Sequence, residues 1–236
     1  MIIFINKKFI YGIFAFILLL CLSIYLVNDN TSKVSTNMPV TNKVIILDAG
    51  HGDLDTGAVG ENNTFEKDIN LQIVLKLRTL LEESGALVIL TREKDQRLYD
   101  KAQTIREKYL EDLRNRKQLI KDSKADLLIS IHLNSFPQKK YYGAQVFYPK
   151  SDKKSKEIAQ FIQEELRRVL DKENKRNIKP RDNIYLLENN NIPSVLIECG
   201  FLSNEREAEL LKTDSYQDKI AWAIYIGIQK YFSSIE

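Results

Sequence analysis

Cysteine and histidine are scarce in this sequence, whose 236 residues include only two of each. Cys199 is the only cysteine after residue 42, so no internal disulfide is possible in that part of the chain, and an oxidising compartment would not stabilise it. The sequence contains no internal repeat and no basic stripe interleaved with aromatic residues. Its formal net charge is only +3. The composition therefore does not indicate a nucleic-acid-binding protein.

Charged residues are also absent from a long run near the N-terminus. Lys7 and Lys8 precede an uncharged, mostly apolar run at residues 9–27, and about 20 apolar residues are enough to cross the hydrocarbon core of a bilayer. No A-x-A-like cleavage site closes the run, so we predict an uncleaved transmembrane anchor at residues 1–27 rather than a signal peptide. The preceding lysines place the N-terminus in the cytoplasm. The rest of the chain is then expected on the extracytoplasmic face of the cell membrane, or secreted if the segment is cleaved.

The remainder of the chain has two parts. Residues 28–42 are polar and lack periodicity, which predicts a tether. Residues 43–236 are enough for one domain with its own core, and their apolar runs alternate with amphipathic stretches. This pattern predicts an α/β fold with a mostly parallel, twisted sheet flanked by helices on both faces. Strands are expected at 44–47, 86–90, 127–131, 143–148 and 195–197, and helices at 66–83, 99–124, 155–170, 204–211 and 216–232.

Each of the two histidines follows a predicted strand. His51 lies in VIILDAGHG and His132 lies in LLISIHLNS. Because open α/β sheets place their chemistry just beyond the carboxyl ends of the strands, both imidazoles are expected at one edge of the sheet. With one carboxylate they would form a zinc site of three protein ligands and one open position. The alternative is a pair of unrelated capping or core histidines.

Two glutamates are placed to complete such a site. Glu66 opens a predicted helix after the glycine-containing loop that starts at His51, and Glu198 ends a separate buried strand. One of them is expected to bind the metal. The other is expected to take a proton from water and pass it to the leaving nitrogen. The residues alone leave open which glutamate has which role.

Four segments, taken in order, resemble one enzyme family. They are DAGHG at 48–52 with TGA at 56–58, EKDINL at 66–71, SIHLN at 130–134 and PSVLIECGFLSN at 193–204. Over residues 43–232 the sequence resembles the zinc-dependent N-acetylmuramoyl-L-alanine amidases. It departs from that pattern at Ala49, where the family often has proline, and at Asp53, where a second glycine is usual. Neither position is a ligand, so the departures concern the shape of the loop.

The resemblance implies a complete set of site residues. His51, Glu66 and His132 would bind Zn²⁺ at the edge of the sheet, and Glu198 would be the catalytic carboxylate. The reaction implied is hydrolysis of the amide between the muramic acid lactyl group and L-alanine of the peptidoglycan stem peptide. Zinc would polarise the carbonyl group, while Glu198 would activate water and protonate the departing amine.

The layout of one anchor and one catalytic domain resembles the germination-specific amidases. Those enzymes act on spore cortex peptidoglycan during the formation of muramic lactam, so the forespore envelope is a possible location. Three alternatives stay open. The chain could be a zinc peptidase that cuts within the stem peptide, a non-catalytic wall-binding protein, or an enzyme that needs an activating protein partner.

Several neighbouring residues have simpler interpretations. Asp48 either orients His51 or caps its own turn, and Asn134 either contacts substrate or fixes its own loop. Cys199 would need a histidine as its base to act as a nucleophile, and both histidines are better employed on zinc. Arg92, Arg114 and Arg181 could meet peptide carboxylates, but most such arginines are surface charges, so none of them is expected to be a site residue.

Overall fold

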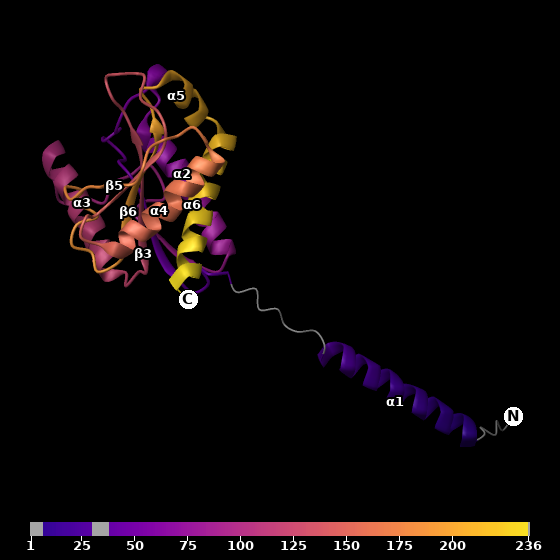
Figure 1. The fold of residues 1–236 in the computed structure, drawn as a ribbon. Coiled ribbons are helices and arrows are strands. Elements are labelled where there is room, and N and C mark those ends of the chain that lie inside the picture. The colour runs from indigo at the N-terminus through magenta and orange to yellow at the C-terminus, as the bar shows by residue number, and fades with distance from the viewer. Residues whose placement is uncertain (1–6, 30–37, 236) are drawn as a thin grey trace. The chain divides into compact units, whose positions relative to one another are not determined.

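The computed structural model describes residues 7–29 and 38–235 (Figure 1). The chain divides into two compact units, Met1–Thr36 and Asn37–Glu236. The boundaries predicted from the sequence, at residues 27 and 42, stay predictions. Part of the predicted tether, residues 30–37, lies outside the described residues.

The first unit contains helix α1 (Lys7–Asp29). Within the part of the chain that the structure describes, no helix has the length and apolar character needed to cross a membrane. The predicted transmembrane anchor at residues 1–27 is therefore not supported. The same holds for the membrane partner and the anchored location inferred from it.

The second unit is built on a six-stranded sheet in the order β2-β1-β3-β6-β4-β5. Strands β2, β1, β3 and β6 are parallel to one another, whereas β4 is antiparallel to β6. The sheet is thus mixed, although four of its five strand pairs are parallel, as the sequence predicted for most of the sheet. The ten residues between β3 and β4 contain no helix, and a connection between parallel strands needs about a dozen residues or more. The strands are β1 (Val44–Ala49), β2 (Leu87–Leu90), β3 (Leu127–Asn134), β4 (Gln145–Tyr148), β5 (Lys179–Pro180) and β6 (Ser194–Phe201).

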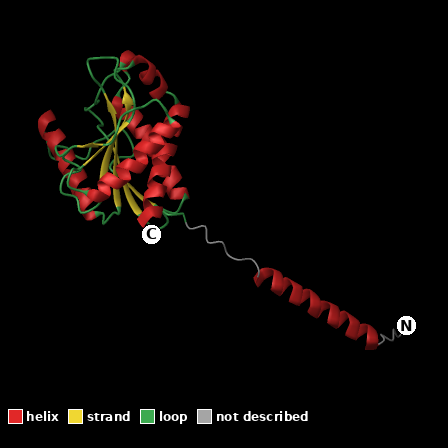
Figure 2. Cartoon of the chain, viewed as in Figure 1, coloured by secondary structure: helices red, strands yellow, loops and turns green. Residues whose placement is uncertain are grey.

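Helices cover both faces of this sheet, as the sequence predicted (Figures 1 and 2). Helices α2 (Glu66–Glu83), α4 (Lys153–Val169) and α6 (Asp214–Ile235) lie on one side, and α3 (Ile105–Asp122) lies on the other. The predicted bounds of α2 are confirmed, and Gly85, at φ +83°, follows its C-terminus. The two short helices are η1 (Glu61–Asn63) and α5 (Glu205–Leu211).

The central strands β1, β3 and β6 are largely buried on both faces. In β1, Ile45 and Leu47 belong to the larger apolar core, which includes residues of α2, α4 and α6. Ile46 belongs to a smaller core that includes Ile120 of α3. Asp48 is the exception in this strand, because it is a fully buried carboxylate. By the alternation of side chains along a strand, its side chain lies on the same face as Ile46, toward α3.

The register of the sheet brings the functional segments to one edge. Ala49 of β1 pairs with Ile131 of β3, and His132 pairs with Glu198 of β6. His132 and Glu198 therefore lie within their strands, whereas the sequence placed them just after or at the strand ends. His51 follows β1 by two residues. The carboxyl ends of three neighbouring parallel strands thus carry three of the four predicted site residues.

Helix α6 approaches α4 closely at Gly227, where a methyl group would lie 2.8 Å from the Cα atom of Ile162. We expect Gly227→Ala to lower the free energy of unfolding by about 1–3 kcal/mol, because the helices would have to separate. This outweighs the gain of about 1 kcal/mol that alanine normally brings to a helix interior. Equilibrium urea denaturation measures the difference. Lys219→Ala, at an exposed position of α6, is the control. A Gly227→Ala protein as stable as the wild type would contradict the close approach.

Candidate functional site

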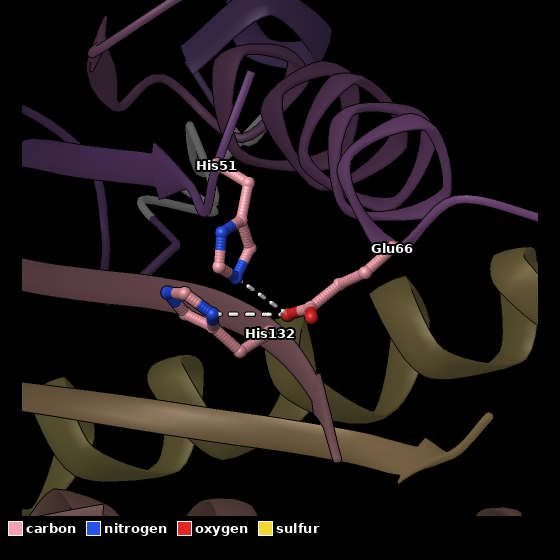
Figure 3. Close-up of side chains that lie close together, drawn as sticks. All are labelled: His51, Glu66 and His132. Carbon is pink, nitrogen blue, oxygen red and sulfur yellow. Dashed lines mark hydrogen bonds and ion pairs between the residues drawn. The ribbon is translucent and has the colours of Figure 1, made fainter. Parts of the chain in front are cut away.

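Two imidazoles and one carboxylate meet at the carboxyl edge of the sheet (Figure 3). Nε2 of His51 lies 3.2 Å from Oε1 of Glu66, and Nδ1 of His132 lies 3.0 Å from the same oxygen. One ligand atom from each of the three residues lies within 4.8 Å of the others, so the group could hold a metal ion. The structure therefore brings together the three residues that the sequence had proposed as ligands.

Glu66 is held by several donors. It is the first residue of α2, where the positive end of the helix dipole favours a carboxylate. Oε2 accepts a hydrogen bond from the backbone N–H of Ala58 at 2.8 Å, and Oε1 accepts one from the N–H of Leu133 at 2.9 Å. Burial by itself raises the pKa of Glu66, but hydrogen bonds and charge from His132 and His51 bring it well below its usual range. The carboxylate is therefore ionised at neutral pH.

The ring of His132 lies directly against the backbone of Gly50. A Cβ atom at position 50 would lie 2.3 Å from Cε1 of His132 and 2.4 Å from its Nε2 atom. No other residue type fits here without displacing the imidazole. The glycine of the DAGHG segment thus supplies the space that the second histidine occupies.

His51 has a left-handed backbone conformation, with φ of 63°. Its Nδ1 atom lies 2.9 Å from Oδ2 of Asp55, and its carbonyl oxygen accepts a hydrogen bond from Nη2 of Arg116 at 2.8 Å. Burial by itself lowers the pKa of His51. The hydrogen bonds to Asp55 and Glu66 outweigh this effect and raise the pKa to about 9.

Two buried arginines bind the backbone that precedes His51. Arg92 donates from Nε to the carbonyl oxygen of Ala49 at 2.9 Å and from Nη2 to that of Gly50 at 3.0 Å. Arg116 donates from Nη1 to the carbonyl oxygen of Ala49 at 2.9 Å. Each arginine is 2% exposed. The expectation that Arg92 is a surface charge was therefore wrong, because its donors satisfy carbonyl groups where β1 ends.

Asp48 does not contact His51. It accepts hydrogen bonds from Thr91 at 2.8 Å, Ser130 at 2.6 Å and Arg116 at 2.8 Å. Burial alone raises the pKa of Asp48, but the charge of Arg116 and the hydrogen bonds lower it to about 2. Its role is to anchor Arg116, which neither of the two sequence interpretations anticipated.

The aspartate that contacts the imidazole of His51 is Asp55 rather than Asp48, and sequence reasoning missed it together with Arg97 and Arg116. One signal was present. Asp112, Arg116 and the apolar Ile120 recur at a spacing of four and so fall on one face of the helix. A charged pair on an apolar helix face indicates a buried ion pair, but it does not identify the partners.

Glu198 lies beside His132 in the neighbouring strand, and residues paired in a parallel sheet point to the same face. The residue is partly exposed, yet its Oε2 atom is buried and has no hydrogen-bond partner among the described residues. Burial, with the nearby charge of Glu66 adding to it, raises the pKa of Glu198 to about 7. A carboxyl group with this pKa can both accept and donate a proton near neutral pH.

Two other residues near the site are explained by packing and local structure. Cys199 is fully buried in the larger core, on the face of β6 opposite to Glu198, and burial raises the pKa of its thiol well above the usual range. It is therefore unsuited to act as a nucleophile. Oδ1 of Asn134 accepts a hydrogen bond from the N–H of Ser135 at 2.9 Å, so Asn134 fixes its own loop.

Comparison with known proteins points to one family. The Amidase_3 family of N-acetylmuramoyl-L-alanine amidases matches residues 45–230. The chain is 44% identical over 227 residues to the germination-specific N-acetylmuramoyl-L-alanine amidase of Bacillus subtilis (strain 168), covering 96% of this chain and 95% of that protein.

Solved structures agree with this match. The structure of the CwlD amidase from Clostridioides difficile in complex with the GerS lipoprotein is 64% identical, with a TM-score of 0.81, and covers 82% of this chain and 100% of that chain. The N-acetylmuramoyl-L-alanine amidase from Clostridium difficile 630 is 31% identical, with a TM-score of 0.72, and covers 83% of this chain and 100% of that chain.

The raised pKa of Glu198 leads to a prediction about how stability depends on pH. Its folded-state pKa of about 7 lies above the ordinary 4.5, so the folded protein prefers the protonated form. This preference adds to the free energy of unfolding. The added stability is fully present below pH 4.5 and is lost as the pH rises to about 7. In chelated, metal-free protein, Glu198→Gln stays neutral. Relative to the wild type it should therefore gain about 3 kcal/mol in free energy of unfolding over this range.

Urea denaturation at a series of pH values measures this gain. Glu205→Gln removes a carboxylate from an exposed position and supplies the control. If the difference in free energy of unfolding between the wild type and Glu198→Gln is the same at every pH, ionisation of Glu198 does not destabilise the folded protein.

Proposed function

The chain belongs to the Amidase_3 family of N-acetylmuramoyl-L-alanine amidases, and on this premise we propose that it is a zinc enzyme of the spore cortex. Membership makes it an enzyme that cleaves peptidoglycan. The proposed reaction is hydrolysis of the amide bond between N-acetylmuramic acid and L-alanine of the stem peptide. The observation that carries the proposal is the convergence of His51, Glu66 and His132 within 4.8 Å, beside the unpartnered Oε2 atom of Glu198.

The three converging side chains have the donor chemistry that zinc prefers. Catalytic zinc sites commonly combine three protein ligands from histidine and carboxylate residues with one position for water or substrate. We assign Nε2 of His51, Nδ1 of His132 and Oε1 of Glu66 as ligand atoms, because these are the atoms that face one another. When bound, zinc supplies Lewis-acid polarisation of the scissile carbonyl and makes water more acidic.

Glu198 is the proposed proton carrier. Its Oε2 atom accepts a proton as the water oxygen forms a bond to the carbonyl carbon. The same carboxyl group then donates this proton to the nitrogen of L-alanine as the carbon–nitrogen bond breaks. The muramic acid lactyl group leaves as a carboxylic acid and the stem peptide leaves as an amine. In the protein without metal, burial raises the pKa of this carboxyl group to about 7, and such a shift favours a group that accepts a proton and then donates it near neutral pH.

The more specific proposals rest on relatives. The 44% identical protein from Bacillus subtilis is a germination-specific amidase, which supports a substrate in spore cortex peptidoglycan and a location outside the cytoplasm. The Clostridioides difficile amidase was solved with the GerS lipoprotein, which supports a lipoprotein as an activating partner of this chain. The proposed catalytic domain comprises residues 43–236.

The reaction can be tested directly by product analysis. The full chain, supplied with zinc, should release stem peptides that begin at L-alanine from cortex peptidoglycan sacculi, and mass spectrometry identifies them. A chelated sample is the control. Peptides cut at an internal bond would instead establish a peptidase. If the chain binds zinc but releases nothing, adding the cognate lipoprotein decides whether a partner is required.

Two variants should separate the roles of the site residues. Glu198→Gln is expected to keep its zinc and lose activity by about 10²- to 10⁴-fold, because the proton carrier is missing. His51→Ala is expected to lose zinc itself, which atomic absorption measures without any assay of activity. Substantial turnover by Glu198→Gln, or full zinc occupancy in His51→Ala, would contradict the corresponding assignment.

A further inference from the structure

His51 is restrained at both its ring and its backbone. Nδ1 of the ring lies 2.9 Å from Oδ2 of Asp55, on the side opposite to the Nε2 atom that faces Glu66. The backbone carbonyl accepts a hydrogen bond from Arg116 at 2.8 Å, and φ is 63°. A non-glycine residue in this left-handed region is uncommon and persists where surrounding contacts impose it.

Asp55 is itself held in place. The same Oδ2 atom that faces His51 accepts a hydrogen bond from Nη2 of Arg97 at 2.7 Å, while Oδ1 accepts one from the N–H of Gly57 at 3.2 Å. The side chain of Arg97 is only 2% exposed. The carboxylate cannot rotate away from the histidine without removing a charge-assisted hydrogen bond from this buried guanidinium, which is costly.

These contacts close into a ring of charges. Nε of Arg97 lies 3.8 Å from Oδ2 of Asp112, and that oxygen accepts a hydrogen bond from Nε of Arg116 at 3.0 Å. Arg116 then reaches the carbonyl oxygen of His51. Four charged side chains thus run from the ring nitrogen of His51 back to its own backbone. Helix α3 contributes two of them, Asp112 and Arg116.

We propose that Asp55 and Arg97 are positioning residues that keep the proton of His51 on Nδ1 and direct the lone pair of Nε2 toward the metal. The inference rests on the proposed function, since it takes His51 as a ligand. A carboxylate that accepts from the distal N–H of a ligating imidazole fixes the tautomer, orients the ring and strengthens the ligand nitrogen. Arg97 acts indirectly, by fixing the carboxylate of Asp55.

A merely structural role for Asp55, as a staple of its own loop, would have different consequences. Asp55→Asn keeps the size of the side chain and an oxygen that can accept from Gly57. It removes the negative charge and sets an N–H₂ group among three donors. A loop staple would lose stability without changing the histidine ring. A positioning residue would change the protonation pattern of His51 and the zinc affinity in a protein that is still folded.

The test uses the full-length chain, purified without a histidine tag, in wild-type, Asp55→Asn, Arg97→Lys and Asp53→Asn forms. Asp53 is the matched control, because it lies in the same loop but its carboxylate accepts from the hydroxyl of Tyr99 at 2.8 Å. Zinc affinity is measured by competition with a chromogenic chelator. The tautomer is measured by ¹⁵N NMR of the imidazoles, and the chain has only two histidines, so the signals of His51 and His132 can be separated.

We expect Asp55→Asn to bind zinc about 10- to 100-fold more weakly than the wild type. Its His51 signals should lose the pattern of a protonated Nδ1 and a metal-bound Nε2, while those of His132 keep theirs. Arg97→Lys should change both readouts in the same direction, because lysine cannot reproduce the guanidinium geometry. Asp53→Asn should match the wild type.

Two results would overturn the inference. The first is an Asp55→Asn protein that folds, binds zinc as tightly as the wild type and retains the His51 tautomer. The second applies if circular dichroism shows that Asp55→Asn does not fold: an Arg97→Lys protein, in which Asp55 is still in place, with wild-type zinc affinity and His51 tautomer. A wild-type chain that binds no zinc is distinct from both cases, because it would overturn the proposed function and this inference with it.

Discussion

The buried ion pair between Asp48 and Arg116 determines how β1 meets helix α3, and the site is built on that junction. Taking two charges out of water is unfavourable unless they are paired and their remaining hydrogen-bonding groups are satisfied. Here Asp48 has three donors, from Thr91, Ser130 and Arg116. Arg116 in turn donates to Asp112 and to the carbonyl oxygens of Ala49 and His51. Because each group has a partner, the pair specifies one geometry for the segment that carries His51.

The site also depends on a difference in protonation between two glutamates. Glu66 receives backbone N–H donors at a helix start and faces two imidazoles, so it is ionised and suited to bind a cation. Glu198 lies one strand away from that cluster, with a buried oxygen that has no donor among the described residues, and its pKa rises to about 7. The same residue type thus acquires two chemical characters from its surroundings. This contrast supports the proposed assignment of ligand and proton carrier.

Helices pack on both faces of the strands that carry the site. The large core beneath α2, α4 and α6 buries one face of the central strands, and close contact at Gly227 lets α6 lie against α4. On the other face, α3 supplies both apolar contacts and the guanidinium of Arg116, which reaches the backbone of the loop after β1. Stability and site geometry are therefore coupled through α3. A change in the packing of α3 would reach the backbone of His51 through Arg116, although α3 supplies none of the three proposed metal ligands.

The sequence by itself determined the location of the site, because the carboxyl ends of neighbouring parallel strands must meet and both histidines lie close to such ends. It also determined the bounds of α2, since the apolar periodicity and Gly85 are local signals. It did not determine the direction of β4, the burial of Arg92, or which of Glu66 and Glu198 faces the imidazoles. Only the tertiary structure decided these points and revealed the contacts of Asp55 with Arg97 and of Arg116 with His51, which join residues 42 and 65 positions apart. Contacts at such separations follow from packing whole elements together, and no local propensity encodes them.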